Sequence, residues 1–74
     1  MNNANKPTVT VKETTYEMVY QIKGDCNIGA WISKKHIEQY GLAIAFDIKC
    51  DQLERMNYRK TLQIAREVRK ALGL

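Results

Sequence analysis

The first part of the chain alternates between hydrophobic and polar positions, which predicts β-strands with one buried face. Valines alternate with Thr and Lys over residues 8–12, and a second alternating run covers residues 16–23. The phase of the alternation changes near Glu13, which indicates either a bulge or a break between two short strands. Residues 24–27 are typical of a turn, and the apolar pattern resumes over residues 28–32. We therefore expect a β-hairpin that pairs the second run with the third.

The register of this hairpin decides the environment of the aromatic residues. If Lys23 pairs with Ile28 across a four-residue turn, Tyr20 lies opposite Trp31, and such an aromatic pair adds up to about 1 kcal/mol. A slip of one residue would move Trp31 to the other face of the sheet. Together with Tyr16, these rings could instead form an exposed platform on which single-stranded nucleic acid stacks. We expect them to form the core, because a small domain needs their large apolar area.

A short helix and an ambiguous segment follow the hairpin. Ser33 is a good N-cap for a helix over residues 34–40, and Gly41 is a natural C-terminal stop. Over residues 42–49, apolar side chains alternate with Ala and Asp, which favours a third strand. A short helix is the alternative, because the alanines of this segment are good helix formers.

The last segment has the periodicity of an amphipathic helix. Asp51 can cap its N-terminus, residues 52–72 contain neither Gly nor Pro, and Gly73 is a stop signal. The pattern predicts one continuous helix of about six turns. Its apolar face contains Leu53, Ile64, Val68, Ala71 and Leu72, with Asn57 and Ala65 beside them.

Together these elements predict the α+β class. We expect a disordered N-terminal tail over residues 1–7 and a single domain over residues 8–74. In this domain a small antiparallel hairpin, extended to three strands, carries a short helix and the long C-terminal amphipathic helix packed on it. A chain of 74 residues buries only about 60% of the surface of its unfolded form, so its core is small. We therefore also expect a symmetric homodimer, through the long helix or through an edge of the sheet.

The composition is that of an ordinary globular protein, with 45% hydrophobic residues, 27% charged residues and a net charge of +4. The first seven residues are polar and contain no apolar stretch of an export signal. No apolar run is long enough to cross a bilayer. We expect a cytoplasmic protein without membrane contact, of a size that suits a bacterial, plasmid or phage accessory protein.

The sequence contains no recognised motif for catalysis or metal binding. Cys26, His36 and Cys50 are the only Cys and His residues, and none has the spacing of a zinc-ligand pair. Without an export signal we expect both cysteines to be reduced thiols. No nucleophile elbow, P-loop or metalloprotease motif occurs, and the chain is too short to enclose a typical ligand pocket. We expect no enzyme activity, no cofactor, no metal and no small-molecule substrate.

The predicted C-terminal helix carries a stripe of basic side chains at intervals of four, seven and four residues, which aligns them on one side. Like charges at i and i+4 cost about 0.2–0.5 kcal/mol each in an isolated helix, and an anionic partner would offset this cost. Arg also matches the geometry of phosphate and carboxylate. The candidate binding residues are Arg55, Arg59, Arg66 and Lys70, with Leu62 inside the stripe, Tyr58 at its edge, and Lys34 and Lys35 as a second basic spot.

Two functions fit this pattern, and a solvated helix face without a ligand is the simpler alternative. The first is a small non-enzymatic nucleic-acid-binding or regulatory protein whose stripe contacts phosphates. The alternative is a protein-interaction module, an inhibitor or adaptor, that docks the same face on an acidic protein. A third possibility is self-association of the chain through exposed apolar residues of the helix. The prediction of an anionic ligand depends on one continuous helix with its cationic side outward. A break near the middle, or guanidinium groups already neutralised by carboxylates of the same molecule, would remove its basis.

Overall fold

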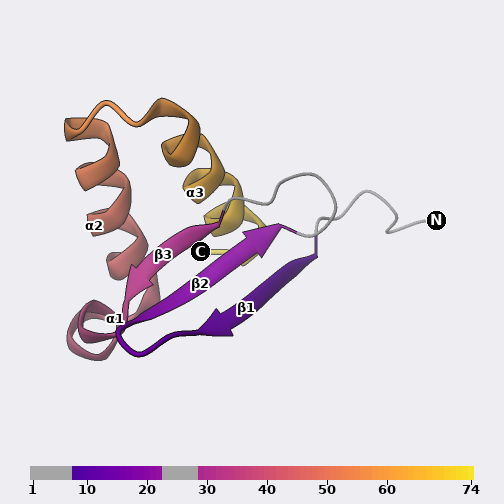
Figure 1. Cartoon of the computed structure of the whole chain (residues 1–74), viewed down its shortest axis with the longest axis vertical. Helices are drawn as coiled ribbons and strands as arrows, with labels where there is room; N and C mark the ends of the chain where they lie inside the picture. Colours follow the sequence, from indigo (N-terminus) through magenta and orange to yellow (C-terminus); the bar gives the residue numbers. More distant parts are fainter. Residues whose placement is uncertain (1–7, 23–28) are drawn as a thin grey trace.

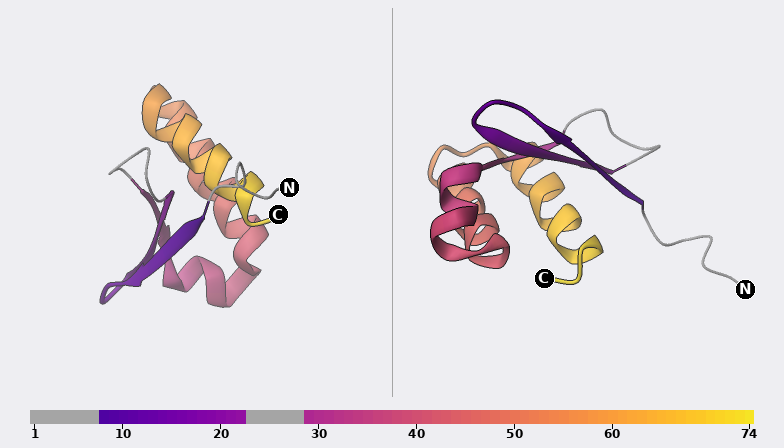
Figure 2. Two further views of the ribbon diagram at one scale, coloured as in Figure 1. Left: turned by 90° about the vertical axis from the view of Figure 1, so that its right-hand side faces the viewer. Right: turned by 90° about the horizontal axis from the view of Figure 1, so that it is seen from below.

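The structure is a computed structural model that describes residues 8–22 and 29–74. Three strands are followed by three helices, so the class is α+β, as the sequence predicts. The helices lie on one face of the sheet, and among the described residues no helix lies on the other face, named here the uncovered face, although Val19 of that face is only 4% exposed (Figure 1 and Figure 2). The elements are β1 (Val9–Glu13), β2 (Glu17–Ile22), β3 (Ala30–Ser33), α1 (Lys34–Tyr40), α2 (Leu42–Arg55) and α3 (Arg59–Ala71).

The sheet is an antiparallel meander in the order β1-β2-β3. Glu13, the last residue of β1, lies opposite Met18 of β2. The chain turns back between them, where the Thr14 N–H donates to the Glu17 carbonyl and the Glu17 N–H donates to the Thr14 hydroxyl. The phase change near Glu13 is therefore a break between two strands and not a bulge. The third strand of the sheet comes from this N-terminal segment and not from residues 42–49.

The pairing of β2 with β3 differs by one residue from the predicted register. Trp31 lies opposite Val19 and not opposite Tyr20, so it projects from the uncovered face and is 46% exposed. Tyr20 projects from the other face into the core, where its ring centroid is 5.3 Å from that of Phe46. The prediction that the aromatic residues form the core is confirmed for Tyr20, whereas Tyr16 and Trp31 are exposed.

Some predicted features lie outside the described residues. These are the N-terminal tail over residues 1–7, the turn over residues 24–27 and the pairing of Lys23 with Ile28. Within residues 8–22 and 29–74, no helix combines the length and the apolar character that crossing a membrane requires.

The first two helices meet at Gly41. The Ser33 hydroxyl accepts a hydrogen bond from the His36 N–H, so Ser33 caps α1 as predicted. Gly41 ends α1 with a φ of 88°, a conformation that favours glycine, and α2 begins at the next residue. Residues 42–49 therefore belong to a helix, and the prediction of a strand there is wrong. Phe46 is fully buried, whereas Ile44 is half exposed. The difference arises because helical periodicity distributes the alternating residues around the axis.

The predicted continuous helix over residues 52–72 is also wrong. The α2 helix ends at Arg55, and Asn57 has a φ of 62°, in the left-handed region that Asn tolerates better than most residues. The chain therefore reverses, and α2 and α3 run antiparallel as a helical hairpin (Figure 1). Asp51 lies inside α2 and does not cap a helix. Gly73, with a φ of 75°, follows the end of α3, so this predicted stop is confirmed.

The core lies between the sheet and the helical layer. The helices pack beneath β2 and β3, whereas β1 packs extensively only against β2. Val11 of β1 shares the helix side of the sheet with Tyr20 but is 49% exposed, because no helix covers it. Most of the predicted apolar helix face is buried, although it is divided between two helices. The buried core cluster is Tyr20, Ala30, Ile32, Ala45, Phe46, Leu53, Leu62, Ile64, Ala65 and Val68.

Candidate functional site

Positive charge is concentrated in the last helix. The α3 helix contains five Lys and Arg residues and one Glu, which gives it a net charge of +4. The whole chain also has a net charge of +4, so its other residues hold seven basic and seven acidic side chains. The excess positive charge of the chain is thus a property of one helix of 13 residues.

Three of the predicted stripe residues form a row on α3. Arg59, Arg66 and Lys70 fall within a sector of about 40° when each residue turns the helix by about 100°. The sector lies opposite Val68, which is fully buried against the sheet, so the row faces outward. Among the described residues none of the three has a carboxylate within ion-pair distance. These three cations are therefore available to an external anion.

Other basic residues are already paired with carboxylates. Arg55 at the end of α2 lies 3.1 Å from the carboxylate of Asp51 one turn earlier. Lys34 at the start of α1 forms an ion pair with Glu13 of β1. The hydrogen bond from Lys34 and its positive charge hold the pKa of the Glu13 carboxyl below its ordinary value. Two of the candidate binding residues, Arg55 and Lys34, thus have partners within the chain.

The remaining candidates lie in three different environments. Leu62 is 8% exposed and belongs to the core, so most of its side chain is inaccessible to a partner. Tyr58 precedes α3 and is 53% exposed beside the row. Lys35 is exposed on α1, and α2 lies between α1 and α3 (Figure 1). The second basic spot is therefore separate from the α3 row.

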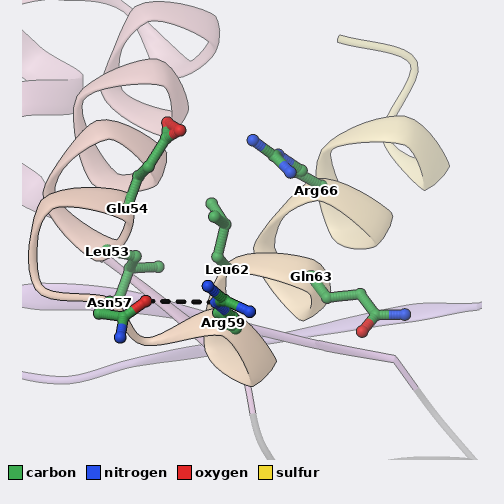
Figure 3. Close-up of a pocket in the computed structure, with 7 residues that line it drawn as sticks. All are labelled: Leu53, Glu54, Asn57, Arg59, Leu62, Gln63 and Arg66. Carbon is green, nitrogen blue, oxygen red and sulfur yellow. Dashed lines mark hydrogen bonds between the residues drawn. The ribbon is translucent and has the colours of Figure 1, made fainter.

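A shallow groove of about 490 Å³ runs between the end of α2 and the start of α3 (Figure 3). Leu53 and Leu62 contribute its apolar lining. The Arg59 Nε–H donates to the Asn57 Oδ1 at 3.2 Å, which orients the guanidinium group. Glu54 of α2 and Arg66 of α3 extend toward each other from opposite sides of the groove (Figure 3). One wall is therefore cationic, and the other carries a carboxylate that disfavours an anion deep in the groove.

The start of α3 is electrostatically unusual. Its first two residues, Arg59 and Lys60, are cationic, and its first turn contains no acidic residue. No side chain caps this end, because Tyr58 occupies the N-cap position without a side-chain hydrogen bond. The helix dipole disfavours cations here by about 0.3–1 kcal/mol each. An anion at this end would interact favourably with both the side chains and the unpaired backbone N–H groups.

Sequence reasoning missed the roles of two residues that shape this region. Asn57 makes the turn and orients Arg59, and Glu54 forms the acidic wall of the groove. Lys60, which flanks the predicted stripe, adds charge to the start of α3. The signal for the turn was Asn57 itself, because Asn adopts the left-handed conformation more readily than other residues apart from Gly.

The described residues contain no group of three or more His, Cys, Asp and Glu side chains that could hold a metal ion. Cys50 is a free thiol packed against the core, and Cys26 lies outside the described residues. Burial raises the pKa of the Cys50 thiol above its ordinary value, and the nearby Arg66 and Arg69 only partly oppose this. The surroundings of Cys50 therefore disfavour the thiolate, which is the nucleophilic form.

Comparison with protein-family models, with curated proteins and with solved structures finds no match for this chain.

Proposed function

We propose that the outward side of α3 binds the phosphate backbone of a nucleic acid, and that the protein is a small non-enzymatic binding or regulatory protein. The observation that most supports this is the concentration of the net charge in α3, where Arg59, Arg66 and Lys70 face outward without a carboxylate partner among the described residues. The break at Asn57 removes the long rod on which the sequence argument depended. The proposal therefore relies on α3 alone.

The dimensions of the row suit a nucleic-acid backbone. Arg59 and Lys70 are eleven residues apart, which corresponds to about 16 Å along a helix at about 1.5 Å per residue. One strand of B-DNA advances about 3.4 Å per nucleotide, so the row spans about five nucleotides. Three cations can therefore contact three phosphates of a single strand. The two Arg residues can bind phosphate oxygens in a bidentate manner.

The start of α3 supports the same proposal. The cations at Arg59 and Lys60 and the uncapped N–H groups of the first turn all attract an anion. A phosphate at this end would offset an arrangement that is unfavourable in the free protein. A cytoplasmic location, where nucleic acid is accessible, accompanies this proposal.

The salt dependence of binding tests the proposal. The probes are a fluorescein-labelled DNA duplex of about 20 base pairs and one of its single strands, titrated at about 50 and 200 mM NaCl. Neutralising three phosphates predicts that log K falls with log salt at a slope of about −3 for the duplex. If neither probe binds at the lower salt concentration, the proposal is wrong.

A matched pair of variants separates the α3 row from net charge. The triple variant Arg59→Gln, Arg66→Gln, Lys70→Gln removes the three outward cations and should abolish most of the salt-dependent binding. The control variant Lys12→Gln, Lys23→Gln, Lys49→Gln makes the same change in net charge outside α3 and outside the candidate binding residues. Equal loss of binding in both variants would show that binding depends on overall charge and not on α3.

An exposed apolar pair favours a second candidate, docking on an acidic protein surface. Met56 and Tyr58 in the α2–α3 turn are 56% and 53% exposed, and they lie in the chain next to Arg55 and Arg59. Interface hot spots combine Tyr, Arg and Met in this way. The double variant Met56→Ser, Tyr58→Ser should leave phosphate binding unchanged. It should abolish stoichiometric capture of a single protein partner from a nuclease-treated lysate if this second function is correct.

A further inference from the structure

No strand among the described residues pairs with the outer edge of β1, so this open edge has a defined set of backbone groups without a described partner. The Thr14 N–H donates to the Glu17 carbonyl, which identifies this pair as hydrogen-bonded in the ladder between β1 and β2. Hydrogen-bonded and non-hydrogen-bonded pairs alternate in an antiparallel ladder, so Thr10 and Lys12 also bond to β2. The N–H and C=O groups that point away from β2 toward the open edge are those of Val9, Val11 and Glu13.

An exposed apolar side chain lies at the centre of this edge. Val11 projects from the helix side of the sheet, as its partner Tyr20 does, but the helices pack beneath β2 and β3. Val11 is consequently 49% exposed. In Figure 1, β1 forms the edge of the sheet farthest from α2.

We propose that two copies of the chain pair along β1 in an antiparallel manner, with the two-fold axis at Val11. Each Val11 then lies opposite the Val11 of the second copy, and Val9 lies opposite Glu13. These are the residues whose backbone groups are free, so they form hydrogen-bonded pairs across the axis. Thr10 and Lys12 face each other as a non-hydrogen-bonded pair on the uncovered face. The two three-stranded sheets become one sheet of six strands.

The sequence of β1 favours this register over its neighbours. Centring the axis on Lys12 or on Glu13 would place like charges directly opposite each other, which is destabilising. Centring it on Thr10 places no like charges opposite each other but leaves Glu13 without a partner in β1, and centring it on Val9 would leave half of the strand unpaired. The Val11 register pairs all five residues of β1 and places no like charges directly opposite. The strand is thus complementary to itself, which is what a closed two-fold interface requires.

The other edge of the sheet is a poorer candidate. The β3 strand has four residues, and Ser33 at its end is the N-cap of α1, so the chain leaves the sheet at once. The β1 edge has no helix at either end among the described residues. In the proposed dimer the two Lys12 side chains occupy diagonal positions, and the pairing of two five-residue strands is a small interface. We therefore expect a weak dimer, with a dissociation constant on the order of 10–100 μM.

The two-fold axis of such a pairing is perpendicular to the sheet, which places both helical layers on the same side. Two α3 helices would then act on one ligand, although the dimer itself does not depend on the proposed nucleic-acid binding. Self-association is measured without nucleic acid, so the failure of either proposal leaves the other testable.

The first experiment is sedimentation of the full chain at protein concentrations from about 5 to 500 μM, a range that brackets the expected dissociation constant. Val11→Pro removes the outward N–H, and Pro is tolerated on an edge strand. Val11→Lys keeps the N–H but places two cations opposite each other. Both variants should weaken association at least tenfold, whereas Val11→Thr, which keeps the N–H and the size, should still associate. Circular dichroism at the lowest concentration shows whether each variant is folded.

Amide hydrogen exchange gives an independent readout for the wild-type chain. The amides of Thr10 and Lys12 should be protected at all concentrations, and those of Val9, Val11 and Glu13 should gain protection only as the protein concentration rises. A strict monomer at about 500 μM would overturn the proposal. A dimer that survives in folded Val11→Lys would overturn it too, because the contact would then lie elsewhere.

Discussion

The guanidinium group of Arg69 on α3 lies 3.1 Å from the carboxylate of Asp47 on α2, near the end of the helical hairpin opposite the turn at Asn57. The two helices are thus joined covalently at one end and by an ion pair near the other. The side chain of Arg69 is only 34% exposed, and its Nε is buried without a hydrogen-bond partner in the part of the chain that the structure describes. Arg69 therefore holds the hairpin together, whereas Arg59, Arg66 and Lys70 of the same helix face solvent.

Removing the charge of Asp47 should loosen the hairpin slightly. For Asp47→Asn we expect the free energy of unfolding to fall by about 0.2–1 kcal/mol, because the pair is partly exposed. For a domain of this size the melting temperature should fall by a few degrees, on the order of 2–6 °C. Thermal unfolding of Asp47→Asn, Arg69→Met and the double variant gives the coupling energy, and additive effects would mean that the ion pair contributes nothing.

The turn between α2 and α3 should tolerate Gly but not Ala at position 57. Asn57→Ala places a residue with a Cβ in the left-handed region, which costs about 1 kcal/mol or more. Asn57→Gly removes the same hydrogen bond to Arg59 without this backbone strain. Urea unfolding should therefore show Asn57→Gly to be the more stable of the two, and equal midpoints would contradict the left-handed turn.

A close approach between strands should make Gly29 intolerant of any side chain. A Cβ at this position would lie 2.7 Å from the Gln21 Cγ and 2.8 Å from the Tyr20 carbonyl oxygen. Because the carbonyl belongs to the backbone of β2, the strands themselves must move. We expect Gly29→Ala to reduce the free energy of unfolding by about 1–3 kcal/mol in urea unfolding. An unchanged midpoint would show that the strands separate here at little cost.

Stability should depend on pH through Glu13. Lys34 lowers the pKa of the Glu13 carboxyl in the folded state, so this contribution is fully present above its unfolded pKa of about 4.3. The contribution is lost as the pH falls through the lower folded pKa, because the carboxyl becomes protonated. We expect Lys34→Gln to be less stable than the wild type at pH 7 and equally stable near the acid end of the titration. An NMR titration of Glu13 should show its pKa rise in Lys34→Gln.

Local chemistry explains which parts of the fold the sequence predicts. Ser33, Gly41 and Gly73 act through their own backbone or hydroxyl preferences, and each has the predicted role. The hairpin of β2 and β3 follows from alternation, but its register depends on the connection and on packing, so Trp31 moved to the other face. Residues 42–49 were misassigned because alternating Ala, Ile, Phe and Leu satisfy a strand pattern and a buried helix pattern alike.

The candidate site was predicted only in part for a related reason. The sequence predicts one helix for the stripe because no Gly or Pro interrupts residues 52–72, but Asn57 adopts a left-handed conformation that ends α2. Arg59, Arg66 and Lys70 remain aligned because all three lie on the same side of the break. Arg55 lies at the end of α2 and is therefore not aligned with them. Leu62 is buried because α2 folds back and packs against its side of α3. Tertiary packing of this kind leaves no periodic signal in the sequence.

Placing the entire net charge in one helix has a kinetic consequence. A molecule of this kind has its centre of charge displaced from its centre of mass, and the field of a distant polyanion exerts a torque on it. The protein would therefore rotate before collision, so that α3 arrives first. Encounters in the wrong orientation become rarer, and this pre-alignment weakens as the Debye length shortens to about 8 Å at physiological ionic strength.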